Sequence, residues 1–382
     1  MLWMPAAYGY PMPQTHVALL FGGRSGEHEI SLRSARSVAD AIDRTTYRLT
    51  LVGIDRLGRW HLLDDAAFRQ LTDRPFAALT DEGTEVTFVT VPGAAALIDP
   101  RRGTTLVDGI DAVFPVLHGP YGEDGTVQGL FELADVAYVG AGVLGSAVGM
   151  DKDVQKRLLQ AADLPVVPWR TITPAQWGHD RDGITAAVRQ LGLPVFVKPA
   201  NLGSSVGISK VRTLDTLAAA VTAAFDYDVK VVIETGVDAR EIECAVLGND
   251  EPEASVPGEI CPRGDFYSYE AKYVDDRGAE LRIPAPLSAD LTGTVRALAV
   301  RVFRVLDCSG LARVDFFLER GTDRLFVNEI NTLPGFTSIS MYPKLWDASG
   351  LPYAALIDRL IALALARHAQ RQKLNKEYRP RS

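Results

Sequence analysis

The sequence has few cysteines and histidines, and their scattered positions argue against a metal site built from cysteines and against a zinc site. Three cysteines, Cys244, Cys261 and Cys308, lie far apart in a chain of 382 residues and lack the spacing of metal ligands. This pattern is typical of free thiols in a reducing compartment, so we expect a cytoplasmic protein. The six histidines are equally scattered, which leaves a zinc site without support.

The chain also lacks long apolar runs and basic blocks. No apolar stretch approaches the length of a membrane span, and the first residues show neither the basic start nor the apolar core of a secretory signal. The 40 Lys and Arg against 48 Asp and Glu give a formal charge of −8, with no basic block to contact a phosphate backbone. We therefore expect neither a membrane nor a nucleic acid as a partner.

Two strand-like runs near the C-terminal end carry polar residues at a spacing of two. One run holds Arg313 and Asp315, and the other holds Glu329 and Asn331. Because residues two apart project from the same face of a strand, these side chains could face one cleft. Two carboxylates and an amide form the oxygen set that suits Mg²⁺ on nucleotide phosphates, and Arg313 adds a fixed cation. An edge hairpin with solvated acids is the alternative; the Asn-Thr-Leu-Pro-Gly that ends the second run favours the metal site.

Strand and helix signals alternate from His16 onward, which predicts an α/β (α+β) fold. We expect a disordered extension over 1–14, an N-terminal α/β domain over 15–139, a central domain over 140–234, a C-terminal domain over 235–370 and a tail over 371–382. The stretch from about 56 to 110 reads as a β-rich insertion in the first domain. The long polar loop over 261–283 has the character of a functional lid.

A small-residue loop, Gly203-Ser204-Ser205-Val206-Gly207, can expose backbone N–H groups to a ligand. It is not a Walker A loop, because no Gly-Lys-Ser or Gly-Lys-Thr follows. By itself it is explained equally well as a hairpin turn. Lys198, on the strand before it, and Lys152, at the head of an earlier helix, could supply cations for nucleotide phosphates, although each alone could be a solvated surface charge.

The apolar run over 231–234 predicts a strand beside a nucleotide base. Backbone groups at Glu234 and Val237 could read adenine, and the carboxylate of Glu241 could take the ribose hydroxyls. A strand that links two domains and carries an exposed acid explains the same residues equally well.

Two glycine-rich turns follow strands of the expected N-terminal sheet, at the edge where open α/β sheets bind ligands. The first contains Glu27, which could meet a substrate ammonium or could serve as an ordinary helix-capping acid. The second begins at His118 and could close the same pocket, although a structural turn explains its Glu123 and Asp124 slightly better. The first turn lacks G-x-G-x-x-G, so a dinucleotide site is not supported.

Taken together, these segments resemble the D-alanine–D-alanine ligases of the ATP-grasp superfamily, from about His16 to about Ala366. The segments that carry the resemblance are 22–32 (GGRSGEHEISL), 118–129 (HGPYGEDGTVQG), 150–152 (MDK), 197–199 (VKP), 203–207 (GSSVG), 269–273 (YEAKY) and 329–337 (EINTLPGFT).

The resemblance implies a three-domain ATP-grasp architecture with an N-terminal parallel-sheet (pre-ATP-grasp) domain and ATP held between the other two domains. It implies a homodimer that joins two D-alanine molecules through a D-alanyl phosphate, for peptidoglycan precursors. ATP, two Mg²⁺ that Mn²⁺ can replace, and a monovalent cation are the cofactors to be considered.

The resemblance also implies a role for each matching residue. Nucleotide contacts would come from Lys152, Lys198, Gly203, Ser204, Ser205, Glu234, Val237, Glu241 and Lys272, and metal ligands would be Asp315, Glu329 and Asn331. Glu27, Ser204 and Tyr273 would tie the lid to the N-terminal domain and exclude water. Arg313 and the backbone N–H of Gly335 would form an oxyanion hole. The two substrates would contact Glu27, His118, Lys272, Ser340 and Met341.

The resemblance leaves the second substrate, the acceptor of the ligation, open among several compounds. Relatives that make D-alanyl-D-lactate tend to carry histidine where this chain has Tyr273, so we expect an amine acceptor. D-serine, or the acceptor of another dipeptide-forming relative, stays open. A catalytically silent nucleotide-binding protein on the same fold would have lost Arg313 or a metal ligand, and none of these residues is missing.

Overall fold

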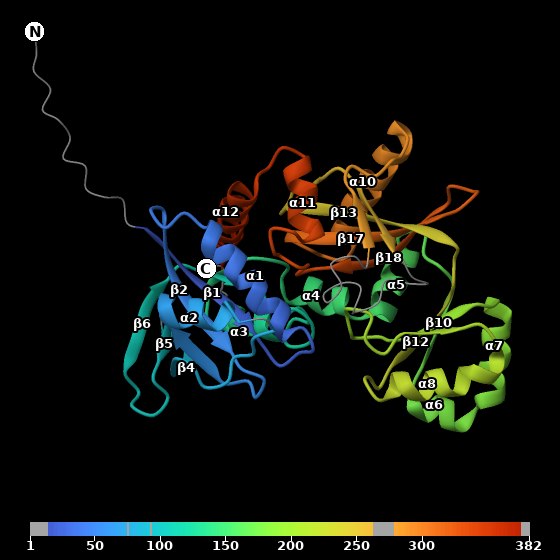
Figure 1. Cartoon of the computed structure of the whole chain (residues 1–382), viewed down its shortest axis with the longest axis horizontal. Helices are drawn as coiled ribbons and strands as arrows, with labels where there is room; N and C mark the ends of the chain where they lie inside the picture. The colour runs from blue at the N-terminus through green and yellow to red at the C-terminus, as the bar shows by residue number, and fades with distance from the viewer. Residues whose placement is uncertain (1–13, 75, 92–93, 263–278, 376–382) are drawn as a thin grey trace, which may run out of the picture.

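The computed structural model describes residues 14–74, 76–91, 94–262 and 279–375. Within these ranges the strands form three sheets. Figure 1 shows the first sheet on one side of the molecule and the other two on the opposite side, with α4 (Val143–Met150) between them.

The N-terminal sheet has the strand order β6-β5-β4-β3-β2-β1-β7-β8. Its strands are β1 (Thr15–Gly22), β2 (Tyr47–Ile54), β3 (Trp60–Leu63), β4 (Thr84–Val91), β5 (Ala94–Ile98), β6 (Thr105–Ile110), β7 (Ala112–Pro115) and β8 (Ala137–Tyr138). From β2 through β1 and β7 to β8 the pairs are parallel, whereas from β2 to β6 they are antiparallel. The segment over 56–110 is β-rich as predicted, but it extends the main sheet. The sheet is therefore mixed, and the prediction of a parallel sheet holds only for its β2-to-β8 part.

Strand β1 lies in the middle of this sheet and is buried on both faces. Val17, Leu19 and Phe21 belong to one core cluster, and the alternating Ala18 and Leu20 belong to another. Helices α1 (His28–Ala41), α2 (Asp65–Thr72) and α12 (Tyr353–Gln372) contribute to the first cluster, and α3 (Thr126–Leu133) contributes to the second. Burial on both faces explains why β1 is an almost continuous apolar run.

The second sheet has four antiparallel strands in the order β11-β10-β12-β9. They are β9 (Trp169–Ile172), β10 (Val195–Pro199), β11 (Ser209–Val211) and β12 (Val231–Thr235). Helices α6 (Pro174–His179), α7 (Arg181–Leu191) and α8 (Leu217–Phe225), with the 3-10 turn η1 (Leu214–Thr216), complete this unit and its separate core.

The third sheet has the order β16-β15-β13-β17-β18, with β14 paired to β13. Its strands are β13 (Ala239–Gly248), β14 (Glu253–Ala254), β15 (Gly258–Pro262), β16 (Ala279–Arg282), β17 (Gly310–Glu319) and β18 (Leu325–Asn331). Helices α4 (Val143–Met150), α5 (Lys152–Ala161) and α10 (Ala289–Val305) contribute to the core on one face, and α11 (Met341–Ala348) lies with α12 in the first cluster. Helices α4 and α5, placed by the sequence in the central domain, thus contribute Val148 and Leu159 to the core of the third sheet.

Helix α12 returns from the C-terminal end of the chain to the N-terminal sheet. Its Leu356, Ile357 and Leu360 belong to the same core cluster as β1 and α1. The prediction of a tail from residue 371 is wrong at its start, because α12 continues to Gln372. Arg371 pairs with Glu132, and Gln372 donates a hydrogen bond to Asp135, so contacts across the domain junction hold this end of the helix.

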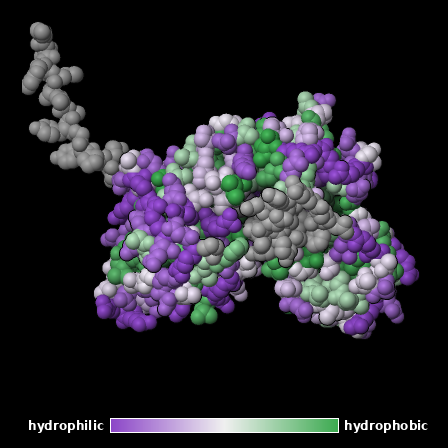
Figure 2. All heavy atoms as spheres, in the orientation of Figure 1, coloured by the Kyte–Doolittle hydropathy of each residue, from purple (hydrophilic) through white to green (hydrophobic). Residues whose placement is uncertain are grey.

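None of the described helices alone is long and apolar enough to cross a membrane; only the bent pair α11 and α12 together meets that criterion, by length and composition. Both helices place apolar side chains in the first core cluster. Figure 2 shows that hydrophilic residues cover most of the N-terminal part of the face in view.

Candidate functional site

Two cavities meet between the three sheets. The first, of about 480 Å³, is lined by residues of all three units, among them Glu27, Arg313, Gly335 and Ser340. The second, of about 530 Å³, lies between the second and third sheets and is lined by Lys152, Lys198, Glu234 and Glu241. Gly203, Ser204 and Glu329 line both cavities. A ligand in one cavity can therefore reach a ligand in the other at this junction.

The paired strands β17 and β18 carry the four polar residues that the sequence singled out. Arg313 lies opposite Asn331, and Asp315 lies opposite Glu329, in an antiparallel register. The prediction that these residues come from neighbouring strands is confirmed. Arg313, Glu329 and Asn331 line the first cavity, and Asp315 contacts Arg313 from the same strand.

Arg313 is held by two carboxylates. Its Nε and Nη2 each lie 2.7 Å from an oxygen of Asp315, and its Nε lies 2.9 Å from Oε2 of Glu243. Burial alone would lower the pKa of Arg313, but Asp315 and Glu243 raise it well above its ordinary value. The guanidinium is thus a permanent cation with a fixed orientation in the cavity wall.

A β-bulge changes the alternation of β18. Asp315 pairs with Glu329, but the next residue, Phe316, pairs with Val327, so Asn328 is the extra residue. As a result the consecutive residues Asn328 and Glu329 both line the second cavity, while Val327 and Ile330 lie in the core. The amide oxygen of Asn328 is buried and has no hydrogen-bond partner among the described residues.

The oxygen atoms of Glu329 and Asn331, which line the first cavity, and of Asp315, whose two oxygens accept from Arg313, are of the kind that hard cations such as Mg²⁺ or Mn²⁺ prefer. The ammonium of Lys152, 3.4 Å from Oε2 of Glu329, shows that this carboxylate already attracts a cation. In the described part of the chain, no three His, Cys, Asp or Glu side chains gather as a metal site. Two carboxylates and an amide leave coordination positions for phosphate oxygens and water, which is how Mg²⁺ commonly binds beside nucleotides.

Glu27 stands at the N-terminus of α1, but its side chain does not cap that helix. Its carboxylate instead accepts a hydrogen bond from the hydroxyl of Ser204. Nearby, Ser25 donates to the carbonyl of His118 over 2.7 Å, which joins the two glycine-rich turns. These turns follow the parallel strands β1 and β7, so their carboxyl ends meet at one edge of the sheet.

His118 lines the first cavity, but both of its ring nitrogens are already hydrogen-bonded. Nδ1 lies 2.9 Å from the carbonyl oxygen of Leu333, and Nε2 lies 3.0 Å from the hydroxyl of Ser34. Burial lowers the pKa of His118, so the ring is held in its neutral form. The side chain links the N-terminal domain to the segment that leads to Gly335.

Glu123 is buried beside Glu27 and lines the first cavity, whereas the sequence slightly favoured a purely structural role for it. Its Oε1 accepts the backbone N–H of Gly119 over 2.8 Å. Burial, followed by the nearby charge of Glu27, raises the pKa of Glu123 to about 8. Near neutral pH the Glu123 carboxyl is therefore mostly protonated.

Two lysines that line the second cavity, and one buried behind its wall, form two groups. Lys152 donates from Nζ to the carbonyl of Leu202 over 2.6 Å, directly before the small-residue loop. Lys198 pairs with Oε1 of Glu234, while Nζ of Lys156 lies 3.0 Å from Oε2 of the same carboxylate. Burial alone would raise the pKa of Glu234, but Lys156 and Lys198 lower it below its ordinary value.

Three residues of the small-residue loop have positive φ angles, a backbone conformation that small residues adopt most easily. Ser204 and Ser205 have φ angles of 52° and 61°, and Gly207 has a φ of 71°. A Cβ at Gly207 would also lie 2.8 Å from side-chain carbons of Pro199 and Tyr227. The positive φ angles turn the loop over the junction of the two cavities, where Gly203 and Ser204 line both.

The remaining residues of the predicted set fall in three places. Ser340, Met341 and Gly335 line the first cavity, and the hydroxyls of Ser340 and Thr337 lie 2.7 Å apart. Ser205, Val237 and Glu241 line the second cavity. Lys272, Tyr273 and most of the predicted lid lie outside the described residues; the lid's two ends form the antiparallel pair β15 and β16.

Sequence reasoning missed several residues of the site. Lys156 follows Lys152 by four residues, which places both on one side of α5. Glu243 follows Glu241 by two on β13, and Asn328 stands where the apolar alternation of β18 changes phase. These spacings are present in the sequence, but the sequence does not show which distant residues contact these side chains.

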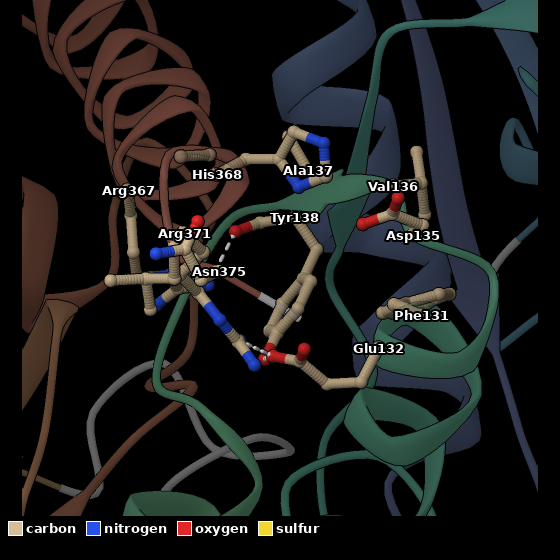
Figure 3. A pocket seen from close by; sticks show the side chains of 12 residues that line it. Phe131, Glu132, Asp135, Val136, Ala137, Tyr138, Arg367, His368, Arg371 and Asn375 are labelled. Atoms are coloured by element: carbon tan, nitrogen blue, oxygen red, sulfur yellow. Dashed lines mark hydrogen bonds and ion pairs between the residues drawn. The ribbon is translucent and has the colours of Figure 1, made fainter. Parts of the chain in front are cut away.

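A third cavity, of about 380 Å³, lies away from the site between α12 and the α3–β8 segment. Figure 3 shows Arg367 and Arg371 of α12 directed toward Tyr138 and Glu132. Arg367 donates to the carbonyl of Tyr138 over 2.9 Å and lies over its ring, with 4.5 Å from the guanidinium carbon to the centroid. These contacts fasten α12 to the N-terminal domain.

Comparisons with known proteins agree over nearly the whole chain. Two family models match, described as D-ala D-ala ligase N-terminus over residues 16–141 and D-ala D-ala ligase C-terminus over residues 158–362. The D-alanine–D-alanine ligase A of Bradyrhizobium diazoefficiens is 54% identical over 368 residues, covering 95% of this chain and 98% of the relative. The ligase A of Escherichia coli K12 is 48% identical over 361 residues, covering 94% and 98%.

Two solved structures extend the comparison. The D-alanine–D-alanine ligase of Coxiella burnetii superposes with a TM-score of 0.81 at 39% identity, covering 94% of this chain and 96% of that one. The VanG D-Ala:D-Ser ligase of Enterococcus faecalis superposes with a TM-score of 0.79 at 34% identity, covering 92% and 100%.

Proposed function

The chain belongs to the D-alanine–D-alanine ligase family, with its ATP-grasp fold, and we propose that it performs the family's ATP-dependent ligation of two D-alanine molecules at the junction of the two cavities. The observation that carries this proposal is that Gly203, Ser204 and Glu329 line both cavities. A carboxylate held in the first cavity can meet the terminal phosphate of a nucleotide held in the second. In this family the dipeptide serves peptidoglycan synthesis.

ATP occupies the second cavity in this proposal. Lys152 and Lys198 face the phosphates, the loop from Gly203 to Ser205 covers them, and backbone groups at Glu234 and Val237 read the base. The carboxylate of Glu241 takes the ribose hydroxyls. The support for this arrangement is that all of these residues line one cavity.

Asp315, Glu329 and Asn331 would hold two Mg²⁺ ions, or Mn²⁺ in their place, which neutralise phosphate charge when bound. Arg313 is the fixed cation beside them. Its guanidinium holds Asp315 through both oxygens, so the orientation of that carboxylate does not depend on a ligand.

The first D-alanine lies in the first cavity with its ammonium toward Glu27. Its carboxylate attacks the terminal phosphate of ATP, which forms D-alanyl phosphate and releases ADP. The hydrogen bond from Ser204 to Glu27 draws the loop over this position. Closure matters because water would hydrolyse the acyl phosphate. Tyr273 completes this closure in the proposal.

The amine of the second D-alanine then attacks the acyl carbon. The negative charge that develops on the oxygen faces Arg313 and the backbone N–H of Gly335, and phosphate leaves as the amide forms. Preorganised donors of this kind typically contribute about 10²–10³ in rate. Ser340 and Lys272 hold the acceptor carboxylate, Met341 lines its pocket, and His118 positions the segment before Gly335.

D-serine is the second candidate acceptor, because the VanG D-Ala:D-Ser ligase is similar over 92% of this chain. We favour D-alanine, the substrate in the names of the relatives at 48–54% identity. Because the reaction consumes ATP, we place it in the cytoplasm. A homodimer is part of the proposal and is tested by sedimentation.

The experiment is phosphate release from ATP and Mg²⁺ with D-alanine, L-alanine, D-serine and D-lactate, singly and in pairs, with the products identified by mass. We expect D-alanyl-D-alanine as the main product and no reaction with L-alanine. Turnover only with a mixed pair would move the acceptor and keep the mechanism. The absence of any amino-acid-dependent phosphate release would overturn the proposal.

A further inference from the structure

Lys156 is a buried cation to which the ligation mechanism above assigns no part. It lies on α5, one helical turn after Lys152, and its side chain is 1% exposed. Taking an ammonium out of water is costly unless it is paired with an opposite charge. Lys156 does not line either of the two cavities, so it acts from behind their wall.

The partner of Lys156 is a residue that does line the nucleotide cavity. Its Nζ lies 3.0 Å from Oε2 of Glu234, and Lys198 occupies the other oxygen of the same carboxylate. The ring of Trp169, with its centroid 5.9 Å from Nζ, bounds the ammonium on another side. The three charged side chains therefore form a row from the interior to the cavity, in the order Lys156, Glu234, Lys198.

Formal charges show what Lys156 changes in this row. Glu234 and Lys198 alone would form a neutral pair beside the nucleotide, whereas the three residues together carry a charge of +1. At a few ångströms inside a protein, one unit of charge has a large effect on the binding of a polyphosphate. The interior lysine offsets Glu234 and leaves the charge of Lys198 for the nucleotide.

We propose that Lys156 is a positioning residue that neutralises and orients Glu234, so that Lys198 presents its positive charge to the phosphates of ATP. This inference rests on the proposed function in one respect: the ligand of the second cavity is taken to be a nucleotide. It concerns binding, so it can be tested without dipeptide formation.

The first test is Lys156→Met, which keeps a long apolar side chain and removes the charge. ATP and ADP affinities should fall on the order of 10-fold, while the affinity for uncharged adenosine stays within about 2-fold. In turnover, KM for ATP should rise more than kcat falls. Titration calorimetry with the three ligands gives the affinities, and Lys373→Met, at the exposed end of α12, controls for a general loss of charge.

The decisive test is a rescue. Lys156→Met combined with Glu234→Gln leaves Lys198 as the single charge of the row, so the net charge returns to +1. ATP affinity should then recover toward the wild-type value. A purely structural role predicts that the double variant binds ATP no better than Lys156→Met.

Three results would overturn the inference: equal losses of ATP and adenosine affinity, unchanged ATP affinity in Lys156→Met, or no recovery in the double variant. If Lys156→Met does not fold, Lys156→Gln replaces it, because the amide can hydrogen-bond to Glu234 but carries no charge. If the wild type binds ATP but forms no dipeptide, the proposed function fails while this test still stands.

Discussion

The hydroxyl of Ser204 donates a hydrogen bond to the carboxylate of Glu27, although 177 residues separate them in the sequence. This contact joins the loop between β10 and β11 to the N-terminus of α1, across the junction of the two cavities. The same carboxylate faces the first cavity, where we place the ammonium of the first substrate. In the proposed function, closure of the loop and binding of the amino acid therefore depend on one side chain.

Ser204→Ala should reduce dipeptide formation by about 10- to 100-fold, the usual effect of one hydrogen bond to a charged group. ATP hydrolysis without dipeptide should rise as a share of turnover, because the loop would exclude water less well. Parallel measurement of phosphate and dipeptide checks both effects. Ser37→Ala, a half-buried serine whose hydroxyl donates to Arg33 within α1, is the control, and unchanged coupling in Ser204→Ala would contradict the role.

Glu329→Gln should abolish turnover, on the order of 10³-fold or more, because a neutral amide holds a divalent cation far less well than a carboxylate. The midpoint of urea unfolding should change little, since Glu329 is partly exposed. The control is Glu319→Gln, a half-buried acid outside both cavities that pairs with Arg324 near the turn between β17 and β18. Activity within a few-fold of wild type in Glu329→Gln would show that the metal site lies elsewhere.

Arg313→Lys keeps the charge of the side chain but loses the planar fork that holds both oxygens of Asp315. We expect kcat to fall on the order of 10²-fold, as for loss of one oxyanion donor. Arg313→Met should also lower the free energy of unfolding by about 3–5 kcal/mol, because buried Asp315 and Glu243 would lose their shared cation. Wild-type kcat in Arg313→Lys would remove Arg313 from the chemistry.

Glu123 predicts a pH dependence of stability. Its pKa is raised from 4.5 to about 8, so between these pH values the folded state binds a proton that the unfolded state has lost. The stabilising contribution is complete below pH 4.5 and is lost as the pH rises toward 8. Glu123→Gln imitates the protonated carboxyl. Its free energy of unfolding should therefore not show this part of the decline with rising pH.

The check is urea unfolding of both proteins from pH 5 to pH 8.5. The free energy of unfolding of the wild type should fall relative to that of Glu123→Gln as the pH rises. Parallel curves for the two proteins would mean that Glu123 is already ionised in the folded state.

Much of this fold could be predicted from local pattern. The alternation in β1, the spacing of Arg313 and Asp315 and the turn after β18 each reflect a rule that acts over a few residues. The place of the segment over 56–110 could not be read in this way. Nothing local distinguishes a strand that extends an existing sheet from a strand in a separate insertion.

The missed site residues have a related cause. In the sequence Lys156 looks like an ordinary lysine on a helix. Its role becomes visible only because Glu234, on another element, lies 3.0 Å from it. Asn328 faces the cavity only because a bulge opposite Asp315 shifts the alternation of β18. Ion pairs and bulges are settled by packing between distant segments, so neighbouring residues in the sequence carry little trace of them.

The return of α12 to the N-terminal sheet has a consequence for synthesis on the ribosome. Part of one face of that sheet is covered by Leu356, Ile357 and Leu360, which are made more than two hundred residues after β8. Until α12 has left the ribosome, this apolar part of the face has to stay exposed or be covered by a chaperone. Nascent chains stopped before residue 350 should therefore be trapped by chaperones, while chains that include α12 are released as folded protein.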